Sequence, residues 1–183
     1  AAMTTTKKAS PDSKTGGMVR FSVAGGEDEE RVSFVRFDLS SLDEDATVDR
    51  ASLQLNLVEH DMGSYEKDTF RVHVDVLPHG GTWKEGEVSW NDGIEEREAE
   101  FVDSFEVDVS GSHDGRRLAS SMTMYELDVT DVVNDVGIGT HDREYARITF
   151  KLYTDEESGR IDFAGKTFNG GNDVPQLVLT LAE

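Results

Sequence analysis

Apolar and polar residues alternate with a period of two along most of this chain. Such alternation is typical of β-strands with one buried face, because successive side chains of a strand point to opposite sides. Eight runs show the pattern, and their apolar positions are Val19, Phe21 and Val23; Val35, Phe37 and Leu39; Leu53, Leu55 and Leu57; Phe70, Val72, Val74 and Val76; Phe105, Val107 and Val109; Tyr125, Leu127 and Val129; Ile148, Phe150 and Leu152; and Leu177, Leu179 and Leu181. The sequence therefore predicts at least eight half-buried strands.

Turn-forming residues separate these runs, as in the pairs Gly25-Gly26, Gly80-Gly81 and Gly170-Gly171. Only two short stretches, 130–136 and 94–100, have helical character. Many strands joined by turns, with very little helix, predict an all-β fold, an antiparallel β-sandwich such as a jelly roll. The length of 183 residues suits one such domain, which we assign to residues 18–183.

The N-terminal segment 1–17 stands apart from that domain as an extended stretch. Its β-prone residues are Met3, Thr4, Thr5 and Thr6, and turn-forming residues follow them. Alone such a strand would fray, so we expect it to pack on this chain or on a neighbouring copy. A strand donated to the next copy, docked near the edge opposite 175–181, makes a head-to-tail contact that propagates into a filament.

The chain carries a formal charge of −20, from 38 acidic and 18 basic residues. Nucleic acid is an unsuitable partner, because binding it requires a basic face. In dilute buffer this charge repels itself, whereas at molar salt the Debye length falls to about 3 Å. We interpret the composition as adaptation to high salt, as in a halophile, with an ordinary acidic secreted protein as the alternative.

Cysteine is absent, so the sequence excludes disulfides and thiolate metal sites. No apolar run is long enough to span a bilayer. The opening Ala1-Ala2-Met3 lacks the basic and apolar segments of a signal peptide, as in a secreted protein after cleavage. We therefore expect an extracellular or cell-surface location.

Five motifs follow one another along the chain: SFVRFDLSSL (33–42), ASLQLNLV (51–58), TWKEGEVSWND (82–92), YELDVTDVV (125–133) and PQLVLTL (175–181). In this order they resemble the DNRLRE-domain family, also called disaggregatase-related repeats, which includes the alginate-binding type of carbohydrate-binding module. The likeness covers nearly the whole chain and implies a non-catalytic extracellular jelly-roll sandwich. One departure is Thr167, which stands after Phe163-Ala164-Gly165-Lys166 where the family carries an acidic residue.

Catalytic patterns are missing from the sequence. The five histidines are scattered without metal-ligand spacing, and no nucleophile-elbow motif occurs. Carboxylate pairs occur throughout so acidic a chain, so they mark no site. We expect that the protein is not an enzyme.

Aromatic residues leave two interpretations open. Trp83 and Trp90 can pack against the edge of the sandwich, with an N–H partner among Glu85, Glu87 and Asn91, or they can stack on a sugar. We favour packing. Phe34 and Tyr153 fall on the outward phase of their strands, so we expect them on the surface.

Several basic residues occupy the polar positions that alternate with the apolar ones along the predicted strands. If those strands share a sheet, they form a basic stripe that holds the uronate or sulfate groups of an acidic polysaccharide such as alginate, or the acidic surface of another copy. The alternative is cross-strand pairing with Asp38 and Asp75. The stripe consists of Arg20, Arg36, Arg71, His73, Arg147 and Lys151, with Tyr153 beside them.

Calcium is the one cofactor that the chemistry suggests, because acidic loops offer the oxygen ligands that this cation prefers. The candidate ligands are Asp43, Asp45, Asp155 and Asp173, although no EF-hand spacing is present. Hydrated surface carboxylates are the alternative. We expect no other cofactor.

Two functions remain open. One is a self-assembling subunit of an extracellular filament or matrix, with copies of the chain as partners. The other is a carbohydrate-binding module for an acidic polysaccharide.

Overall fold

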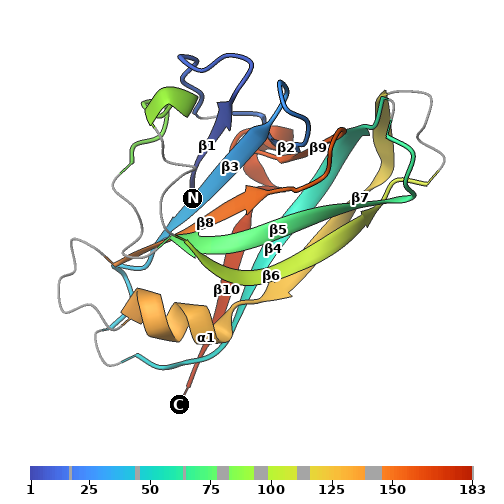
Figure 1. Ribbon diagram of the computed structural model, residues 1–183. Helices are drawn as coiled ribbons and strands as arrows, with labels where there is room; N and C mark the ends of the chain where they lie inside the picture. Colours follow the sequence, from blue (N-terminus) through green and yellow to red (C-terminus); the bar gives the residue numbers. More distant parts are fainter. Residues whose placement is uncertain are drawn as a thin grey trace.

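Antiparallel strands make up most of the chain in the computed structural model, which confirms the predicted all-β fold (Figure 1). The structure describes residues 1–16, 18–43, 46–63, 65–77, 83–92, 99–110, 116–138 and 146–182. For residues 116–121 and 136–138 it describes the backbone alone.

The strands are β1 (Ala2–Lys7), β2 (Arg20–Ala24), β3 (Arg31–Asp38), β4 (Val48–Asp61), β5 (Thr69–Leu77), β6 (Glu100–Asp108), β7 (Arg116–Asp128), β8 (Arg147–Tyr153), β9 (Arg160–Ala164) and β10 (Gln176–Leu181). The short helical turns are η2 (Trp90–Asp92), α1 (Thr130–Val132), η4 (Val133–Ile138) and η6 (Phe168–Gly171). The structure thus confirms the predicted helix at 130–136. In the second predicted stretch, residues 93–98 lie outside the described residues and Glu100 begins β6.

Ten strands form one curled sheet in the described part of the chain, in the order β10-β4-β9-β2-β3-β8-β5-β6, with β1 on β3 and β7 on β4. The sheet curls so that its two halves face each other. One half contains β2, β4, β7, β9 and β10, and the other contains β1, β3, β5, β6 and β8. Contacts between β6 and the opposite half show this closure, since the Phe105 ring lies 4.8 Å from Tyr125 and 6.1 Å from Phe163. The architecture is therefore sandwich-like.

A single large hydrophobic core, the main core, lies between the two halves. It contains inward residues of nearly every predicted strand, and Phe21 stacks on Phe163 with ring centroids 5.3 Å apart. The helical segment closes one end, where Val133 is fully buried and the side chain of Asn134 bonds both the N–H and the C=O of Val48. Period-two alternation thus identifies the core, because it follows the inner face of each strand.

Three details differ from the sequence prediction. Strand β9 was not predicted, since only Ile161 and Phe163 alternate within its five residues. Val19 was expected on a buried face, but β2 begins at Arg20 and Val19 is exposed. Leu181 is also exposed, at the end of β10. No helix in the described residues is long and apolar enough to cross a membrane.

Candidate functional site

The first strand, β1, lies against its own chain. It pairs antiparallel with β3, from Ala2 opposite Arg36 to Lys7 opposite Arg31, while β8 occupies the other edge of β3. Strand β2 pairs with β3 only where Ala24 faces Arg31, and then crosses to the facing half of the sandwich. We call the space between the edge of β3 and the backbone of β2 the β1 groove.

Buried hydroxyl groups line the floor of the β1 groove. The hydroxyl oxygens of Thr5 and Ser33 lie 2.7 Å apart, and Ser33 donates a hydrogen bond of 2.7 Å to the carbonyl of Ser22. Ser22 in turn donates a 2.6 Å bond from its hydroxyl to Asp162, whose carboxylate lies 3.2 Å from Nε of Arg160. A polar strand is thereby accommodated in the interior, because its hydroxyl groups find partners there.

Thr15 covers the second edge of β1. The backbone N–H of Thr5 donates to the hydroxyl of Thr15 at 3.1 Å, and that hydroxyl donates back to the carbonyl of Thr5. The hydroxyl of Thr4 donates to the carbonyl of Thr15. The residues following β1 therefore fold back beside it before β2 begins.

The side chains of β1 are as deeply buried as those of a central strand. Met3 is part of the main core, and Thr4, Thr5 and Thr6 are fully buried. Ala2 packs against a second hydrophobic cluster on the outer face of the same half-sandwich. Strand β1 thus contacts the main core and this second cluster.

That second cluster, the outer cluster, comprises the buried residues Val32, Phe34, Leu77, Trp83 and Val88. The rings of Phe34 and Trp83 lie 6.5 Å apart, so Phe34 is buried and the expectation that it is exposed was wrong. The guanidinium of Arg36 lies 4.5 Å above the Trp83 ring and bonds the Trp83 carbonyl at 2.5 Å.

Packing of Trp83 agrees with the favoured interpretation of the tryptophan motif, since this ring is buried. The expected hydrogen bond is absent, however, because Nε1 of Trp83 has no partner among the described residues. Glu85 instead accepts a 3.3 Å bond from the N–H of Met3 and pairs with Lys166 at 3.0 Å. The motif therefore supports the outer cluster and one end of β1.

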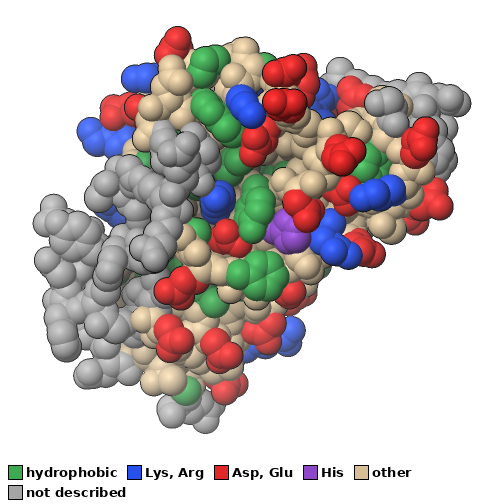
Figure 2. All heavy atoms as spheres, viewed as in Figure 1, with side chains coloured by type: hydrophobic (Ala, Val, Ile, Leu, Met, Phe, Trp, Pro, Cys, Tyr) green, Lys and Arg blue, Asp and Glu red, His purple; other side chains and the backbone are tan. Residues whose placement is uncertain are grey.

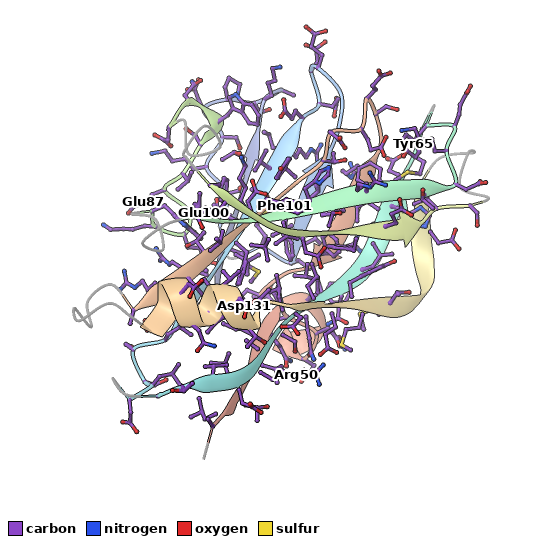
Figure 3. The ribbon with its side chains drawn as sticks, turned by 60° about the horizontal axis from the view of Figure 1, so that its bottom comes forward. Arg50, Tyr65, Glu87, Glu100, Phe101 and Asp131 are labelled. Atoms are coloured by element: carbon purple, nitrogen blue, oxygen red, sulfur yellow. The ribbon has the colours of Figure 1, made fainter. Side chains whose placement is uncertain are left out.

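Beside the outer cluster lies a group of rings, the aromatic patch, formed by the half-buried His73 and Tyr153 and the exposed Phe101. The His73 ring lies 5.1 Å from Tyr153 and 6.4 Å from Phe101, and Phe101 is 64% exposed. Figure 2 views this face, with hydrophobic side chains on either side of a histidine and charged ones around them. Phe101 comes from β6, next to Glu100 (Figure 3).

Charged groups accompany the patch. The ammonium of Lys151 lies 4.9 Å from the centre of the Tyr153 ring. Burial raises the pKa of Asp75, although Lys151 and a hydrogen bond from Tyr153 oppose the shift. Oδ1 of Asp75 is buried and has no hydrogen-bond partner in the described part of the chain. Burial, and then the Asp75 carboxylate, raise the pKa of Tyr153.

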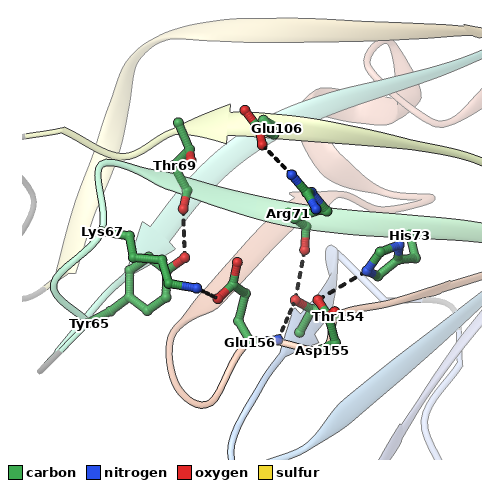
Figure 4. Close-up of polar contacts among 9 residues, drawn as sticks. All are labelled: Tyr65, Lys67, Thr69, Arg71, His73, Glu106, Thr154, Asp155 and Glu156. Atoms are coloured by element: carbon green, nitrogen blue, oxygen red, sulfur yellow. Dashed lines mark hydrogen bonds and ion pairs between the residues drawn. The ribbon is translucent and has the colours of Figure 1, made fainter.

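Ion pairs link the strand ends next to the patch (Figure 4). Arg71 pairs with Glu106 at 2.7 Å, and His73 contacts Asp155 at 3.0 Å. The hydrogen bond from His73 is the largest cause that lowers the pKa of Asp155. The hydroxyl of Thr154 donates to the carbonyl of Arg71 at 2.7 Å.

Five of the six residues of the predicted basic stripe, and Tyr153 beside them, lie on the neighbouring strands β3, β5 and β8. Arg20 lies on β2 in the facing half, where it pairs with the buried carboxylate of Glu59. Arg147 stands opposite Asp38, and Lys151 stands opposite Asp75. The strand register therefore gives the cross-strand arrangement that was the alternative to an open stripe.

The candidate calcium ligands do not form a site in the described residues, which contain no group of three His, Cys, Asp or Glu side chains arranged to hold a metal. Asp155 bonds His73, and Asp173 accepts a 2.8 Å bond from Asn169. Asp43 is exposed, and Asp45 lies outside the described residues.

Phe101 was missed by the sequence reasoning, for a structural reason. Phe101 and Phe105 are four residues apart, so regular alternation would place both side chains on the inner face of the strand. A register shift between Val74 and Asp75 lets Phe101 stand opposite Asp75, an outward position. Because a β-bulge exchanges the two faces of a strand, alternation beyond it misassigns the side chains.

Comparison with protein-family models and with curated proteins finds no match for this chain. The resemblance to the DNRLRE-domain family stays a prediction.

Proposed function

We propose that this protein is a non-catalytic extracellular structural subunit, which assembles with copies of itself by placing β1 in the β1 groove of a neighbour. The observation that carries the proposal is the burial of β1, a strand connected to β2 through residues 8–19. Apart from its bonds to Thr15 in the linker, its contacts are made with β3, β2 and Glu85, which any copy presents equally. The strand pairs in the same way whether it belongs to the same chain or to another.

Competition between the two arrangements depends on concentration. A short linker holds β1 at an effective concentration of about millimolar near its own groove. Opening the linker breaks local turns, such as those from Ser10 N–H to the Lys7 carbonyl and from Ser13 N–H to the Ser10 carbonyl. Exchange is therefore favoured where copies are crowded, as in a matrix at the cell surface.

The geometry of exchange is head-to-tail. A copy that donates β1 keeps its own groove open, because the donor strand and the acceptor groove are different surfaces. Such heterologous contacts extend into a filament when they do not close into a ring. The donated strand itself is uncharged from Ala2 to Thr6, and the charged residues at its ends are basic, with Ala2 opposite Arg36 and Lys7 opposite Arg31.

Complementary cysteine variants test this proposal, because the natural chain contains no cysteine. Thr5→Cys and Ser33→Cys are made in separate chains, since these two side chains face each other. Mixed at high protein concentration in molar salt and oxidised, they are expected to form a disulfide-linked heterodimer.

The matched control mixes Thr5→Cys with Val35→Cys, which stands opposite Met3 on the same face of the groove. This pair is two residues out of register and is expected to cross-link far more slowly. Equal cross-linking of the two mixtures, or none in either, would contradict strand exchange.

The aromatic patch favours a second candidate function, binding of an acidic polysaccharide. The exposed ring of Phe101 and the half-buried ring of Tyr153 offer faces for the C–H groups of a sugar, and the ammonium of Lys151 beside Tyr153 offers a partner for a uronate. Affinity electrophoresis in alginate gels tests this, with Phe101→Ala expected to restore free mobility. Met124→Ala, an exposed position on β7, is the control. Equal retardation of both variants would rule out the patch.

A further inference from the structure

The two ends of the curled sheet are built differently. In the described residues, β6 at one end pairs only with β5, and β10 at the other end pairs only with β4. Each therefore has an edge whose backbone N–H and C=O groups can accept another strand. What distinguishes the two edges is the chemistry of their side chains.

Strand β6 carries the charges that natural proteins use to prevent edge pairing. Its sequence EFVDSFEVD has four acidic residues in nine positions. A second chain of the same charge is therefore repelled from β6. Strand β7, which pairs only with β4 among the described residues, also carries charged residues, from Arg116 at its start to Glu126 and Asp128 at its end.

Strand β10 has no such protection. Its sequence QLVLTL contains no charged residue and no proline, in a protein of which 31% of the residues are charged. On its outward face Val178 is 42% exposed, between Gln176 and Thr180, which are also exposed. On its inner face Leu177 and Leu179 are only partly buried against the main core. The edge is therefore uncharged on both faces, and each face carries exposed or partly buried apolar side chains.

We propose that β10 pairs with β10 of a second copy of this chain. The pairing is antiparallel, because it is related by a two-fold axis normal to the sheet. Residues directly opposite each other in an antiparallel pair have their side chains on the same face of the sheet. One residue of β10 must therefore stand opposite its own copy, with the two-fold axis midway between the two. With Val178 on the axis, Leu177 stands opposite Leu179, and Gln176 stands opposite Thr180. Like side chains then meet like, and the sheets of the two copies become continuous.

The strand fits a second copy of itself, because antiparallel pairing of two β10 strands sets leucine opposite leucine and no carboxylate opposite another. A copy with a net charge of −20 makes contact most favourably where neither surface carries a carboxylate, and β10 meets that condition on both sides. This contact is closed and pairwise, and it does not require exchange of β1. In a filament built by strand exchange, it would join two filaments side by side.

Single cysteines on β10 test the proposal. Val178→Cys places one thiol opposite its counterpart across the two-fold axis, whereas Thr180→Cys faces Gln176 of the second copy and cannot reach its own counterpart. Under mild oxidation in molar salt, Val178→Cys is expected to form a covalent dimer at least tenfold faster than Thr180→Cys. Equal rates for the two variants would overturn the pairing.

Sedimentation provides the second readout. The measurement uses the chain in which an oxidised disulfide between Thr5→Cys and Ser33→Cys holds β1 in its own groove, so that strand exchange does not contribute. In this locked chain Val178→Glu sets two carboxylates against each other and is expected to sediment as a monomer, whereas the locked chain without it sediments as a dimer. Met124→Glu, an exposed change on β7 of the same half-sandwich, is expected to leave the dimer intact. A locked chain that stays monomeric at millimolar concentration, or a dimer that persists in its Val178→Glu variant, would overturn the proposal. Loss of strand exchange through a disulfide between Thr5→Cys and Ser33→Cys leaves this dimer unchanged.

Discussion

The main core and the outer cluster are built from the same kinds of residue but hold different parts of the fold. The main core joins the two halves of the sandwich, with Phe21 stacked on Phe163 at its centre. The outer cluster lies on the other face of β3, beneath the loop that carries Trp83. Strand β1 contacts both, through Met3 and Ala2. Burial on both faces explains how a strand with three threonines stays in place.

The largest expected effect lies in the main core. Phe21→Ala removes a fully buried ring and leaves a cavity between the two halves, so it should lower the free energy of unfolding by about 3–5 kcal/mol. Urea denaturation in molar salt measures this change. A loss comparable to that of an exposed substitution would mean that the two halves are not held together at this point.

Met3→Ala tests the strand that links the two regions. The side chain is fully buried in the main core, but it enters from the edge of a sheet, so we expect a loss of about 2–3 kcal/mol. Hydrogen exchange should locate the loss, with the amides of Thr4 to Thr6 exchanging faster than those of β4. Uniform acceleration in all strands would show that β1 does not open separately.

Val88→Ala tests the outer cluster alone. It removes two buried methyl groups, so the expected loss is about 1–2 kcal/mol. Near-ultraviolet circular dichroism should change through Trp83, while exchange in β4 and β9 stays at wild-type rates. A loss as large as that of Phe21→Ala would make the outer cluster equal to the main core in stabilising the fold.

The smallest effect concerns two carboxylates near the aromatic patch, whose pKa values shift in opposite directions. Burial raises the pKa of Asp75 above 3.8, so its contribution to stability falls as pH rises through that raised value. Asp75→Asn should therefore be more stable than wild type at neutral pH and lose this advantage in acid. The melting temperature across a pH series measures the difference.

The pKa of Asp155 shifts in the opposite direction, so its effect on stability depends on pH in the opposite way. The hydrogen bond from His73 lowers its pKa, so this carboxylate stabilises the fold above its unfolded pKa and stops doing so as pH falls through the lowered value. Asp155→Asn should lower the melting temperature at neutral pH and converge with wild type in acid. If both variants shifted the melting temperature at neutral pH in the same direction, the opposite pKa shifts assigned to Asp75 and Asp155 would be contradicted.

Alternation identified the main core because it reports one face of each strand. It does not report whether the opposite face is covered, which is why Phe34 and Trp83 were harder to place. It fails where a strand is short, as for Ile161 and Phe163 in β9, and beyond a bulge, as for Phe101. Arg20 was grouped with the residues of β5 and β8 because spacing alone does not tell which half of a sandwich a strand joins.

Electron microscopy of a locked variant tests the central claim most directly. The variant carries Thr5→Cys and Ser33→Cys in one chain, is oxidised as a dilute monomer and then concentrated in molar salt beside the wild-type chain. We predict that the wild-type protein forms filaments and that the locked variant forms none until its disulfide is reduced. Filaments of the oxidised variant, or no filaments from the wild-type chain under any of these conditions, would contradict assembly through β1.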